Sequence, residues 1–461
     1  MKLSDLVDFN PKRVLKKGVY ASFVEMASLP ENGRDIINIG NKIFTGSGSK
    51  FSNSDTLFAR ITPCLENGKT SLVSGLLDDE VAFGSTEFIV LSAKEPEYDS
   101  NYIYYLSRLP EFRLFAQSRM EGTSGRQRVA WQALAEYEYE FPGKACRKYA
   151  GELLKKFDDK ILLNHQVNQT LGQMAQALFK SWFIDFEPVK AKIAVLEAGG
   201  SQEEATLAAM TAISGKDADA LVVFELEHPG KYAELKATAE LFPSAMQKSE
   251  LGDIPEGWSV SNIKDNVDVR DGTHASPKPS NSGYHLVTSK NITSGHLERR
   301  SCYYISDVDY HEVNKRSRVA CGDILISMIG TVGALYFVGE KFVNYAIKNI
   351  GLIKTSERQD LQAFIFFYLK GKAGVDYISS RLAGTTQKYL SLKQLREIPL
   401  VIPTKNVLAA FNKKPFLYEI HANQEITETL ANIRDTLLPK LLSGEITLPE
   451  AEEIAKEADY V

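Results

Sequence analysis

The sequence predicts an α+β protein in which two similar mixed α/β domains are joined by two long helices packed as an antiparallel coiled coil, with a helical insert. Three observations lead to this fold class. The chain has 461 residues, which is too long for a single hydrophobic core. Two parts of the chain resemble each other at a constant spacing. Each of these parts ends in a long segment with one apolar stripe of helical periodicity.

The composition is that of a globular protein, with 44% hydrophobic and 25% charged residues. Met1 to Phe9 lacks the apolar core of a signal peptide, and no apolar run approaches the roughly 18 residues that a membrane helix needs. The four cysteines are spaced too widely for a CxxC pair; they are Cys64, Cys146, Cys302 and Cys321. We therefore expect a cytoplasmic protein with buried thiols and no membrane contact.

The internal repeat is clearest in its helical part. Lys160 to Phe183 aligns without gaps on Glu419 to Leu442, at a constant offset of 259. Five aligned pairs are identical: Ile161/Ile420, Asn164/Asn423, Thr170/Thr429, Leu171/Leu430 and Leu178/Leu437. Chance similarity between two amphipathic helices is the alternative explanation. It is weakened because Glu121 to Pro142 also matches Ala383 to Pro403, with one residue inserted.

The two copies follow the same order of expected elements. Residues 55–73 and 323–338 both have the pattern of two strands joined by a turn, and residues 102–119 and 364–381 both read as an aromatic-rich helix. A Gly-Thr turn, a short helical piece and an extended segment ending in Pro then precede each long helix. The chain therefore contains two copies of one module of roughly 180 residues.

Each long helix needs a partner for its apolar stripe. The first stripe consists of Leu154, Phe157, Ile161, Asn164, Val167, Leu171, Met174, Leu178 and Trp182, and the second of Ile420, Asn423, Ile426, Leu430, Ile433 and Leu437. Each helix could pack on its own module, but the matching stripes favour pairing with each other. If the helices pair antiparallel, an approximate twofold axis relates the modules. A helix from about Arg147 to Phe183 is roughly 55 Å long.

Charge is distributed unevenly along the chain, whose net charge is −5. Residues 257–404 carry +6, whereas residues 187–256 carry −7 and residues 405–461 carry −4. The middle segment has a capping box at Ser201 to Glu204 before an apolar run, which predicts a helical insert. A basic second half is compatible with phosphate contact, although charge alone discriminates poorly.

The strings LLNHQVNQTLGQMAQALFKSWFIDFEPV, LGDIPEGW, RDGTHASPKP, VTSKNITSGHL, GDILISMIGTVG and LLPKLLSGEI resemble the specificity subunits of type I restriction-modification systems. The resemblance covers nearly the whole chain, except that the first module lacks a GDIPEGW-like opening. It implies two target-recognition domains, each reading one half of a bipartite DNA site, and helical spacers that fix the gap. It also implies partners: two modification subunits that bind S-adenosylmethionine and methylate adenine, and restriction subunits that use ATP to translocate and cleave.

With this resemblance the sequence divides into six parts. They are target-recognition domain 1 (1–145), spacer helix 1 (146–186), the acidic helical insert (187–250), target-recognition domain 2 (251–404), spacer helix 2 (405–445) and an acidic tail (446–461). The two long helices and the two Gly-Thr segments align closely with each other, whereas the first parts of the two modules do not. We therefore expect two unlike half-sites rather than a palindrome.

The candidate DNA contacts are polar and basic residues on glycine-containing loops, which can reach base edges and phosphates. In the first module they are Thr123, Ser124, Arg126, Gln127 and Arg128. In the second module they are Thr385, Thr386, Gln387 and Lys388, together with Thr273, His274, Lys278, Ser289, Lys290 and Asn291. Each of these residues could instead be an ordinary solvated loop residue.

Two other classes of protein remain as alternatives. A self-contained adenine methyltransferase or nuclease would need an Asn/Asp-Pro-Pro-aromatic motif or a complete nuclease motif, and the sequence has no Pro-Pro pair. A coiled-coil adaptor would never meet DNA. We expect a non-catalytic DNA-binding subunit without a cofactor, a catalytic residue or a metal site.

Overall fold

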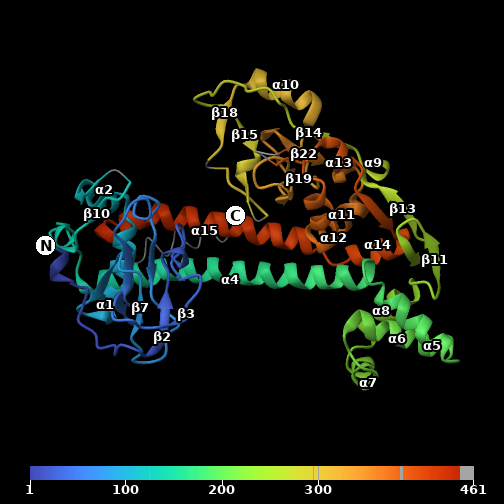
Figure 1. Cartoon of the computed structure of the whole chain (residues 1–461), viewed down its shortest axis with the longest axis horizontal. Coiled ribbons are helices and arrows are strands. Elements are labelled where there is room, and N and C mark those ends of the chain that lie inside the picture. Colours follow the sequence, from blue (N-terminus) through green and yellow to red (C-terminus); the bar gives the residue numbers. More distant parts are fainter. Residues whose placement is uncertain (124, 294, 300, 385–387, 447–461) are drawn as a thin grey trace. The chain divides into compact units, whose positions relative to one another are not determined.

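A computed structural model describes residues 1–123, 125–293, 295–299, 301–384 and 388–446 (Figure 1). The contacts within the chain divide it into two compact units. Unit 1 comprises Met1–Asn164 with Ile426–Val461, and unit 2 comprises His165–Glu425. Both units contain helices and sheets, so the predicted α+β class is confirmed. Among the described helices, none has the length and apolar character needed to cross a membrane.

Two four-stranded sheets form the first part of unit 1. The antiparallel sheet has the order β1-β8-β5-β6, with β1 (Val7–Phe9), β8 (Phe88–Ala93), β5 (Thr56–Ala59) and β6 (Thr70–Leu72). The second sheet has the order β3-β2-β7-β4, with β3 (Gly40–Ile43), β2 (Tyr20–Val24), β7 (Ala82–Gly84) and β4 (Ser49–Phe51). Strands β2 and β7 are parallel. A short pair, β9 (Met120–Glu121) and β10 (Arg128–Val129), stands apart from both sheets.

The helices of unit 1 follow the sheets. They are α1 (Pro96–Arg108), α2 (Pro110–Ser118), α3 (Trp131–Ala135), the first part of α4 (Lys144–Phe183) and the last part of α15 (Phe416–Ser443). The predicted single helix over 102–119 is wrong, because Pro110 ends α1 and begins α2. A proline disfavours a helical residue before it but suits the first turn of a helix. Arg147 joins the start of α4 to α1 through a buried ion pair with Asp99, at 2.6 Å.

Unit 2 repeats the arrangement of the sheets. One sheet has the order β14-β22-β19-β20, with β14 (Val269–Asp271), β22 (Ile350–Ile353), β19 (Ile324–Ser327) and β20 (Leu335–Phe337). The other has the order β18-β15-β21, with β18 (Tyr303–Ile305), β15 (Tyr284–Thr288) and β21 (Tyr345–Lys348), and β15 is parallel to β21. The remaining strands pair as β11 (Met246–Ser249) with β12 (Gly252–Pro255), β13 (Ser259–Asn262) with β23 (Pro399–Ile402), and β16 (Ile292–Thr293) with β17 (His296–Leu297).

The helices of unit 2 include the predicted insert. The insert helices are α5 (Glu187–Glu197), α6 (Gln202–Ser214), α7 (Ala218–Glu227) and α8 (Pro229–Glu240). The others are α9 (Ile263–Asn266), α10 (Asp307–Ser317), α11 (Gln362–Lys370), α12 (Lys372–Ser380), α13 (Leu392–Arg396) and α14 (Lys405–Asn412). The predicted capping box is confirmed: the Ser201 hydroxyl accepts a hydrogen bond from the Glu204 N–H, and the Glu204 carboxylate accepts one from the Ser201 N–H. The aromatic helix predicted over 364–381 is likewise two helices, α11 and α12.

The strand order shows that the two modules share one topology. The order β1-β8-β5-β6 corresponds to β14-β22-β19-β20, and β3-β2-β7 corresponds to β18-β15-β21. The parallel pair occupies the same place in both sheets. A buried aspartate precedes each of the corresponding strands: Asp55 before β5 and Asp323 before β19. The backbone carbonyl of each aspartate accepts a hydrogen bond from the N–H of a valine that follows the next strand, Val73 or Val338. The internal repeat predicted from the sequence is therefore present in the fold.

The ends of the long helices complete the cores. Phe179, Trp182 and Phe183, near the end of α4, are buried in the core of unit 2. The residues 259 positions further along the chain, Leu438, Leu441 and Leu442 of α15, are buried in the core of unit 1. Each module thus receives the end of the helix that follows the other module in the sequence. The sequence analysis considered packing of each helix on its own module or on the other helix, and did not predict this burial of a helix end in the other module.

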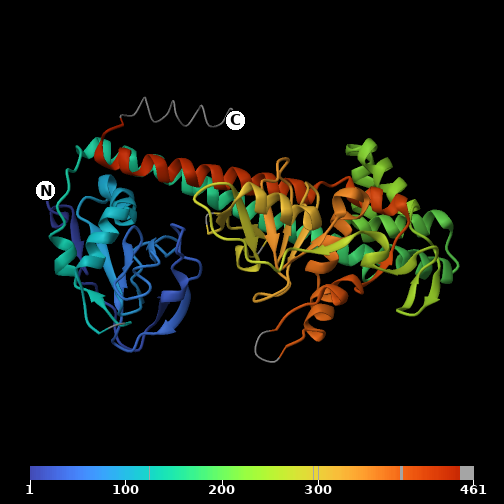
Figure 2. The same cartoon turned by 90° about the horizontal axis from the view of Figure 1, so that it is seen from above.

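Contacts within each unit also join α4 to α15 (Figure 2). In unit 1 the Asn164 amide lies 3.4 Å from the Thr427 hydroxyl, and Arg434 pairs with Asp158. In unit 2 the Asn423 amide donates to Asn168 at 2.9 Å. As residue numbers rise along α4, those of the partners on α15 fall, so the contacting segments are antiparallel. The pairing of both helices as a coiled coil stays a prediction.

Two details of the sequence analysis need correction. Val167, Met174 and Ile426 belong to the predicted apolar stripes, but they are 39%, 54% and 47% exposed. A straight helix has 3.6 residues per turn, so an apolar pattern with a slightly different period drifts around its surface. The thiols are not buried either: Cys146 is exposed, and the other three cysteines are half-buried.

Candidate nucleic-acid interface

In unit 1 the predicted Gly-Thr loop, residues 122–127, projects between β9 and β10. Its base is held by two hydrogen bonds to Thr62: the Thr62 N–H donates to the Gln127 carbonyl at 3.0 Å, and the Gln127 N–H donates to the Thr62 hydroxyl at 3.1 Å. Gly122 and Gly125 have φ values of 125° and 80°, which other residues rarely adopt. The exposed part of the loop therefore stands on a fixed base, with Gln127 half-buried in that base.

The two arginines of this segment have different surroundings. Arg128 binds both carboxylate oxygens of Glu87, and this hydrogen bonding raises the pKa of Arg128. Arg60 approaches the same carboxylate at 3.8 Å. Arg126 is exposed, and its side chain makes no hydrogen bond or ion pair with any other residue in the described ranges. Arg126 and the exposed Thr123 are thus available for an external ligand, whereas Arg128 is held by Glu87. Ser124 lies outside the described residues.

The corresponding loop of unit 2 is attached in the same way. The Leu390 N–H donates to the Met328 carbonyl at 2.9 Å, just as the Val129 N–H donates to the Arg60 carbonyl at 3.0 Å in unit 1. Tyr389 bridges to Ile329 and to Ala383. Lys388 is exposed. The predicted contacts Thr385, Thr386 and Gln387 lie outside the described residues.

A second predicted segment of unit 2 gathers around Asn349. His274 Nδ1 lies 2.8 Å from Asn349 Oδ1, and its Nε2 lies 3.0 Å from Asp271 Oδ2. The Ser289 hydroxyl donates to the Asn349 carbonyl at 2.8 Å, and the Asn349 N–H donates to the Thr273 carbonyl at 3.2 Å. Asn349 has a φ of 54°, a left-handed conformation that asparagine adopts more readily than most residues. This residue therefore connects three positions that the sequence analysis selected separately.

The strand register places these segments at one end of the unit 2 sheet. Ser327, the last residue of β19, pairs with Ile350, the first residue of β22. The Gly-Thr loop is attached two residues beyond Ser327, at Ile329. Asn349 directly precedes Ile350. The residues bound to Asn349 and the Gly-Thr loop thus lie at the same end.

The remaining candidates differ in accessibility. Lys278 and Lys290 are exposed. Ser289 is 8% exposed, and Asn291 is completely buried, with its carboxamide bonded to Thr288 and Ser301. The side chain of Asn291 stabilises the turn in which Lys290 lies, and its polar atoms already have hydrogen-bond partners within the protein. Direct base contact by Asn291 therefore has the least structural support among these predictions.

Several neighbours of the candidates were not selected from the sequence. They are Arg60 and Glu87 in unit 1, and Asp271, Arg316, Lys348 and Asn349 in unit 2. Arg316 pairs with Asp271, and Lys348 donates to the Ser276 hydroxyl. Lys348 and Asn349 could have been noticed, because they separate two apolar strand patterns as a short polar turn. The pairing of Arg60 and Arg128 with Glu87 has no local signal, since these residues are far apart in the sequence.

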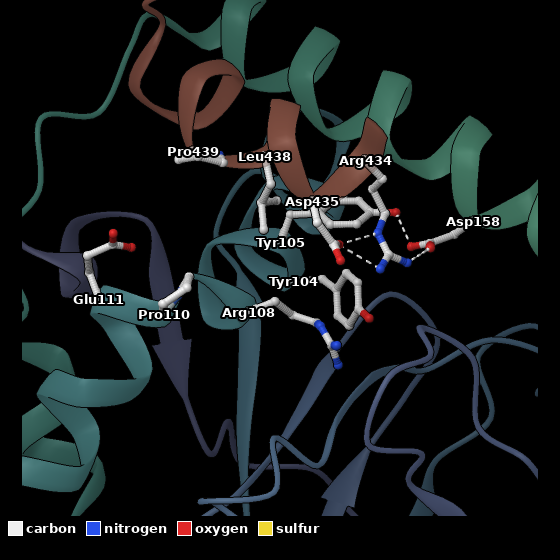
Figure 3. Close-up of a pocket in the computed structure, with 10 residues that line it drawn as sticks. All are labelled: Tyr104, Tyr105, Arg108, Pro110, Glu111, Asp158, Arg434, Asp435, Leu438 and Pro439. Carbon is white, nitrogen blue, oxygen red and sulfur yellow. Dashed lines mark hydrogen bonds and ion pairs between the residues drawn. The ribbon is translucent and has the colours of Figure 1, made fainter. Parts of the chain in front are cut away.

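Unit 1 also contains a pocket of about 270 Å³, lined by residues of α1, α2, α4 and α15 (Figure 3). Figure 3 shows the Arg434 guanidinium between the carboxylates of Asp158 and Asp435. Tyr105 donates to Asp158 at 2.6 Å, and burial with this carboxylate holds the pKa of Tyr105 well above its usual value. These charged groups pair with one another, so we assign them a structural role. Within the described ranges, no group of three or more potential metal ligands is present.

Comparison with known proteins identifies the family. A family model described as "Type I restriction modification DNA specificity domain" matches residues 255–442. The chain is 31% identical over 408 residues to the type I restriction enzyme HindI specificity subunit of Haemophilus influenzae, which covers 85% of this chain and 86% of that protein. It is 24% identical over 362 residues to the MjaIX specificity subunit of Methanocaldococcus jannaschii, with 76% of this chain and 70% of that protein covered.

A solved structure was also found, the type I restriction-modification S subunit from M. genitalium. It aligns with 96% of this chain and 95% of that chain, with a TM-score of 0.49 and 13% identity. The sequence identity and coverage of the Haemophilus relative are sufficient to assign the family. This chain belongs to the specificity subunits of type I restriction-modification enzymes.

Proposed function

We propose that the chain reads a bipartite, asymmetric DNA site, with one half-site bound by each module. The proposal assigns residues 1–145 and 251–404 as the target-recognition domains. The observation that carries it is the position of the two Gly-Thr loops. Both are attached beyond corresponding strands, β5 and β19, and each presents an exposed cation, Arg126 or Lys388.

A specificity subunit is a non-catalytic component of its enzyme, so DNA methylation and cleavage belong to partner subunits. The DNA and the methylase and restriction subunits are thus the partners of this chain. We infer that two modification subunits bind it, because the duplicated frame offers the same surface twice. They would direct methyl transfer to adenine in the two half-sites. The loops of the two modules would then select the DNA sequence, and the duplicated sheets and long helices would hold the catalytic subunits beside it.

The substitutions Arg126→Gln and Lys388→Gln test the separate reading of the half-sites. Each is expected to weaken binding of the site by about 10- to 100-fold, in line with about 1–3 kcal/mol for a lost base contact. Arg126→Gln should change the preferred bases only in one half-site, and Lys388→Gln only in the other. Selection from a randomised DNA library, followed by titration, measures both effects. Each variant serves as the control for the other.

A common loss of affinity with unchanged base preference in both variants would show that these residues contact only phosphates. In that case the slope of log affinity against log salt should fall by about 1 for each variant. Full retention of affinity and base preference in both variants would contradict the assignment of these loops to DNA.

Deleting seven residues from the middle of α4 tests the role of the helices as a ruler. Seven residues of helix correspond to about 10.5 Å, or about three base pairs of DNA. The preferred spacer should therefore change, while both half-sites remain the same. Methylation mapping in cells that also express the cognate modification subunit reads out both properties. Unchanged spacing in a folded deletion variant would refute the ruler role.

A further inference from the structure

Unit 1 carries an exposed basic and apolar surface that has no part in the proposed DNA interface. We call it the K-patch and define it as Lys12, Lys16 and Lys17 together with Val14, Val19, Tyr20 and Ile43. The lysines are exposed, and the apolar residues are 84%, 42%, 69% and 56% exposed, in that order. No ion pair joins these lysines to another described residue. Exposed apolar residues gathered beside unpaired lysines indicate a binding surface.

The backbone of the K-patch is held in place from inside. Between Lys12 and Val14, Arg13 points inward and pairs with Asp55 at 2.7 Å. Lys50 donates to the Arg13 carbonyl at 3.0 Å. These contacts fix the loop while its other side chains stay in solvent. The surface is therefore preorganised, so that binding does not require ordering of the loop.

The K-patch continues from this loop onto the sheet. The Gly18 N–H donates to the Phe44 carbonyl, and the Phe44 N–H donates to the Val19 carbonyl, both at 2.8 Å. The next residues, Tyr20 and Ile43, lie directly opposite each other in β2 and β3. Opposite residues of neighbouring strands project from the same face of a sheet. Tyr20 and Ile43 thus share one face of the sheet, and Val19 connects them along the chain to the lysine loop.

The strand direction separates the K-patch from the Gly-Thr loop. Strand β2 runs from Tyr20, in the patch, to Val24, which pairs with Gly84. Gly84 is three residues before Glu87, the partner of Arg128 at the base of the Gly-Thr loop. The patch and the loop therefore lie at opposite ends of β2. The length of β2 thus separates the patch from the Gly-Thr loop.

The chain contains a segment with complementary chemistry. Residues 447–461 read TLPEAEEIAKEADYV, with five acidic residues, one lysine and the apolar residues Leu448, Ile454, Tyr460 and Val461. The segment follows Ile446, which packs on the core of unit 1. Fifteen residues can span up to about 50 Å, while a domain of this size has a radius of gyration of about 16 Å. The segment is therefore long enough to extend over a large part of the surface of unit 1.

We propose that residues 447–461 dock on the K-patch within the same chain. The carboxylates would face Lys12, Lys16 and Lys17, and the apolar side chains would cover Tyr20 and Ile43. A short connection gives such a segment an effective concentration in the millimolar range, so modest intrinsic affinity is sufficient. The docked segment shields a basic surface away from the DNA-reading end and thereby lowers binding to DNA of unrelated sequence.

A fluorescent peptide of residues 447–461 provides the test. It should bind the chain ending at Ile446 at least 10-fold more tightly than the full chain, because the attached segment competes in the full chain. In the shortened chain, Lys16→Glu with Lys17→Glu should weaken peptide binding at least 10-fold, and Tyr20→Ser several-fold. The matched control is Lys156→Glu with Lys160→Glu, which removes two exposed lysines from α4 of the same unit. The control should stay within 2-fold.

Lysine acetylation of the unmodified proteins gives a second measurement. Lys16 and Lys17 should react several-fold more slowly in the full chain than in the shortened chain, whereas Lys156 should react equally in both. Absence of peptide binding to the shortened chain would overturn the proposal, as would equal binding to the Lys16/Lys17 variant. Equal loss of DNA affinity from this variant in the full and shortened chains would also overturn it, by showing that the K-patch binds DNA directly.

Discussion

Replacing Leu442 with alanine, close to the end of the chain, is expected to destabilise the first module. Leu442 is completely buried in the core of unit 1, and its carbonyl accepts a hydrogen bond from the buried Tyr102 hydroxyl at 2.8 Å. A buried leucine replaced by alanine typically costs about 2–5 kcal/mol, because a cavity remains. The corresponding change in α4, Phe183→Ala, should cost about 3–5 kcal/mol and should destabilise unit 2.

Hydrogen exchange at increasing urea concentration, followed by mass spectrometry, measures whether each substitution destabilises the module that its own helix does not follow. Peptides from residues 1–145 should lose protection in Leu442→Ala, and peptides from residues 251–404 in Phe183→Ala. Leu163→Ala and Met174→Ala are matched controls, because these α4 residues are 50% and 54% exposed. Loss of protection in the opposite module, or in neither, would contradict the exchange of helix ends between modules.

Replacing Lys354 with methionine should destabilise unit 2 by about 3–5 kcal/mol. Lys354 Nζ lies 2.6 Å from Asp323 Oδ2 and 3.2 Å from the Arg318 carbonyl. Asp323 is completely buried and also accepts hydrogen bonds from the backbone of Ala320 and Ser356. Methionine retains most of the side-chain volume but leaves the carboxylate buried without its cation. Urea denaturation, followed by tryptophan fluorescence, measures the change because Trp182 and Trp258 belong to this core.

The double variant Lys354→Met with Asp323→Asn should recover part of the stability, since no buried charge remains unpaired. Lys372→Met is the matched control. It removes an ion pair with Asp376 whose side chains are 88% and 60% exposed, and such pairs contribute about 0–1 kcal/mol. Similar losses from Lys354→Met and Lys372→Met would refute the importance of the buried pair.

The repeat made much of the fold predictable. A direct repeat at a fixed offset predicts equivalent elements in equivalent order, and the matching strand orders confirm that inference. The helix breaks at Pro110 and Gly371 were missed, because the aromatic periodicity continues across both positions. The spacing of apolar residues shows which face of a helical segment is buried. Where the helix ends depends instead on the backbone conformation of one or two residues.

The candidate interface was predictable in part. Glycines next to polar residues indicated the Gly-Thr loops and the segment at Thr273, which the strand register of unit 2 places at one end. The sequence could not distinguish Arg126, which has no described partner, from Arg128, which Glu87 holds. It also could not show that the Asn291 amide is buried and satisfied. These distinctions depend on partners that are distant in the sequence.

The constant offset and the identical residues show, without any coordinates, that the chain is a duplication with divergent loops. Which module buries which helix end is seen only in the folded chain. Phe183 and Leu442 are equivalent in the repeat, yet each is buried in the module that its own helix does not follow. An apolar stripe requires burial but carries no information about the surface that buries it. That surface is set by packing shape, which emerges only when the distant segments meet.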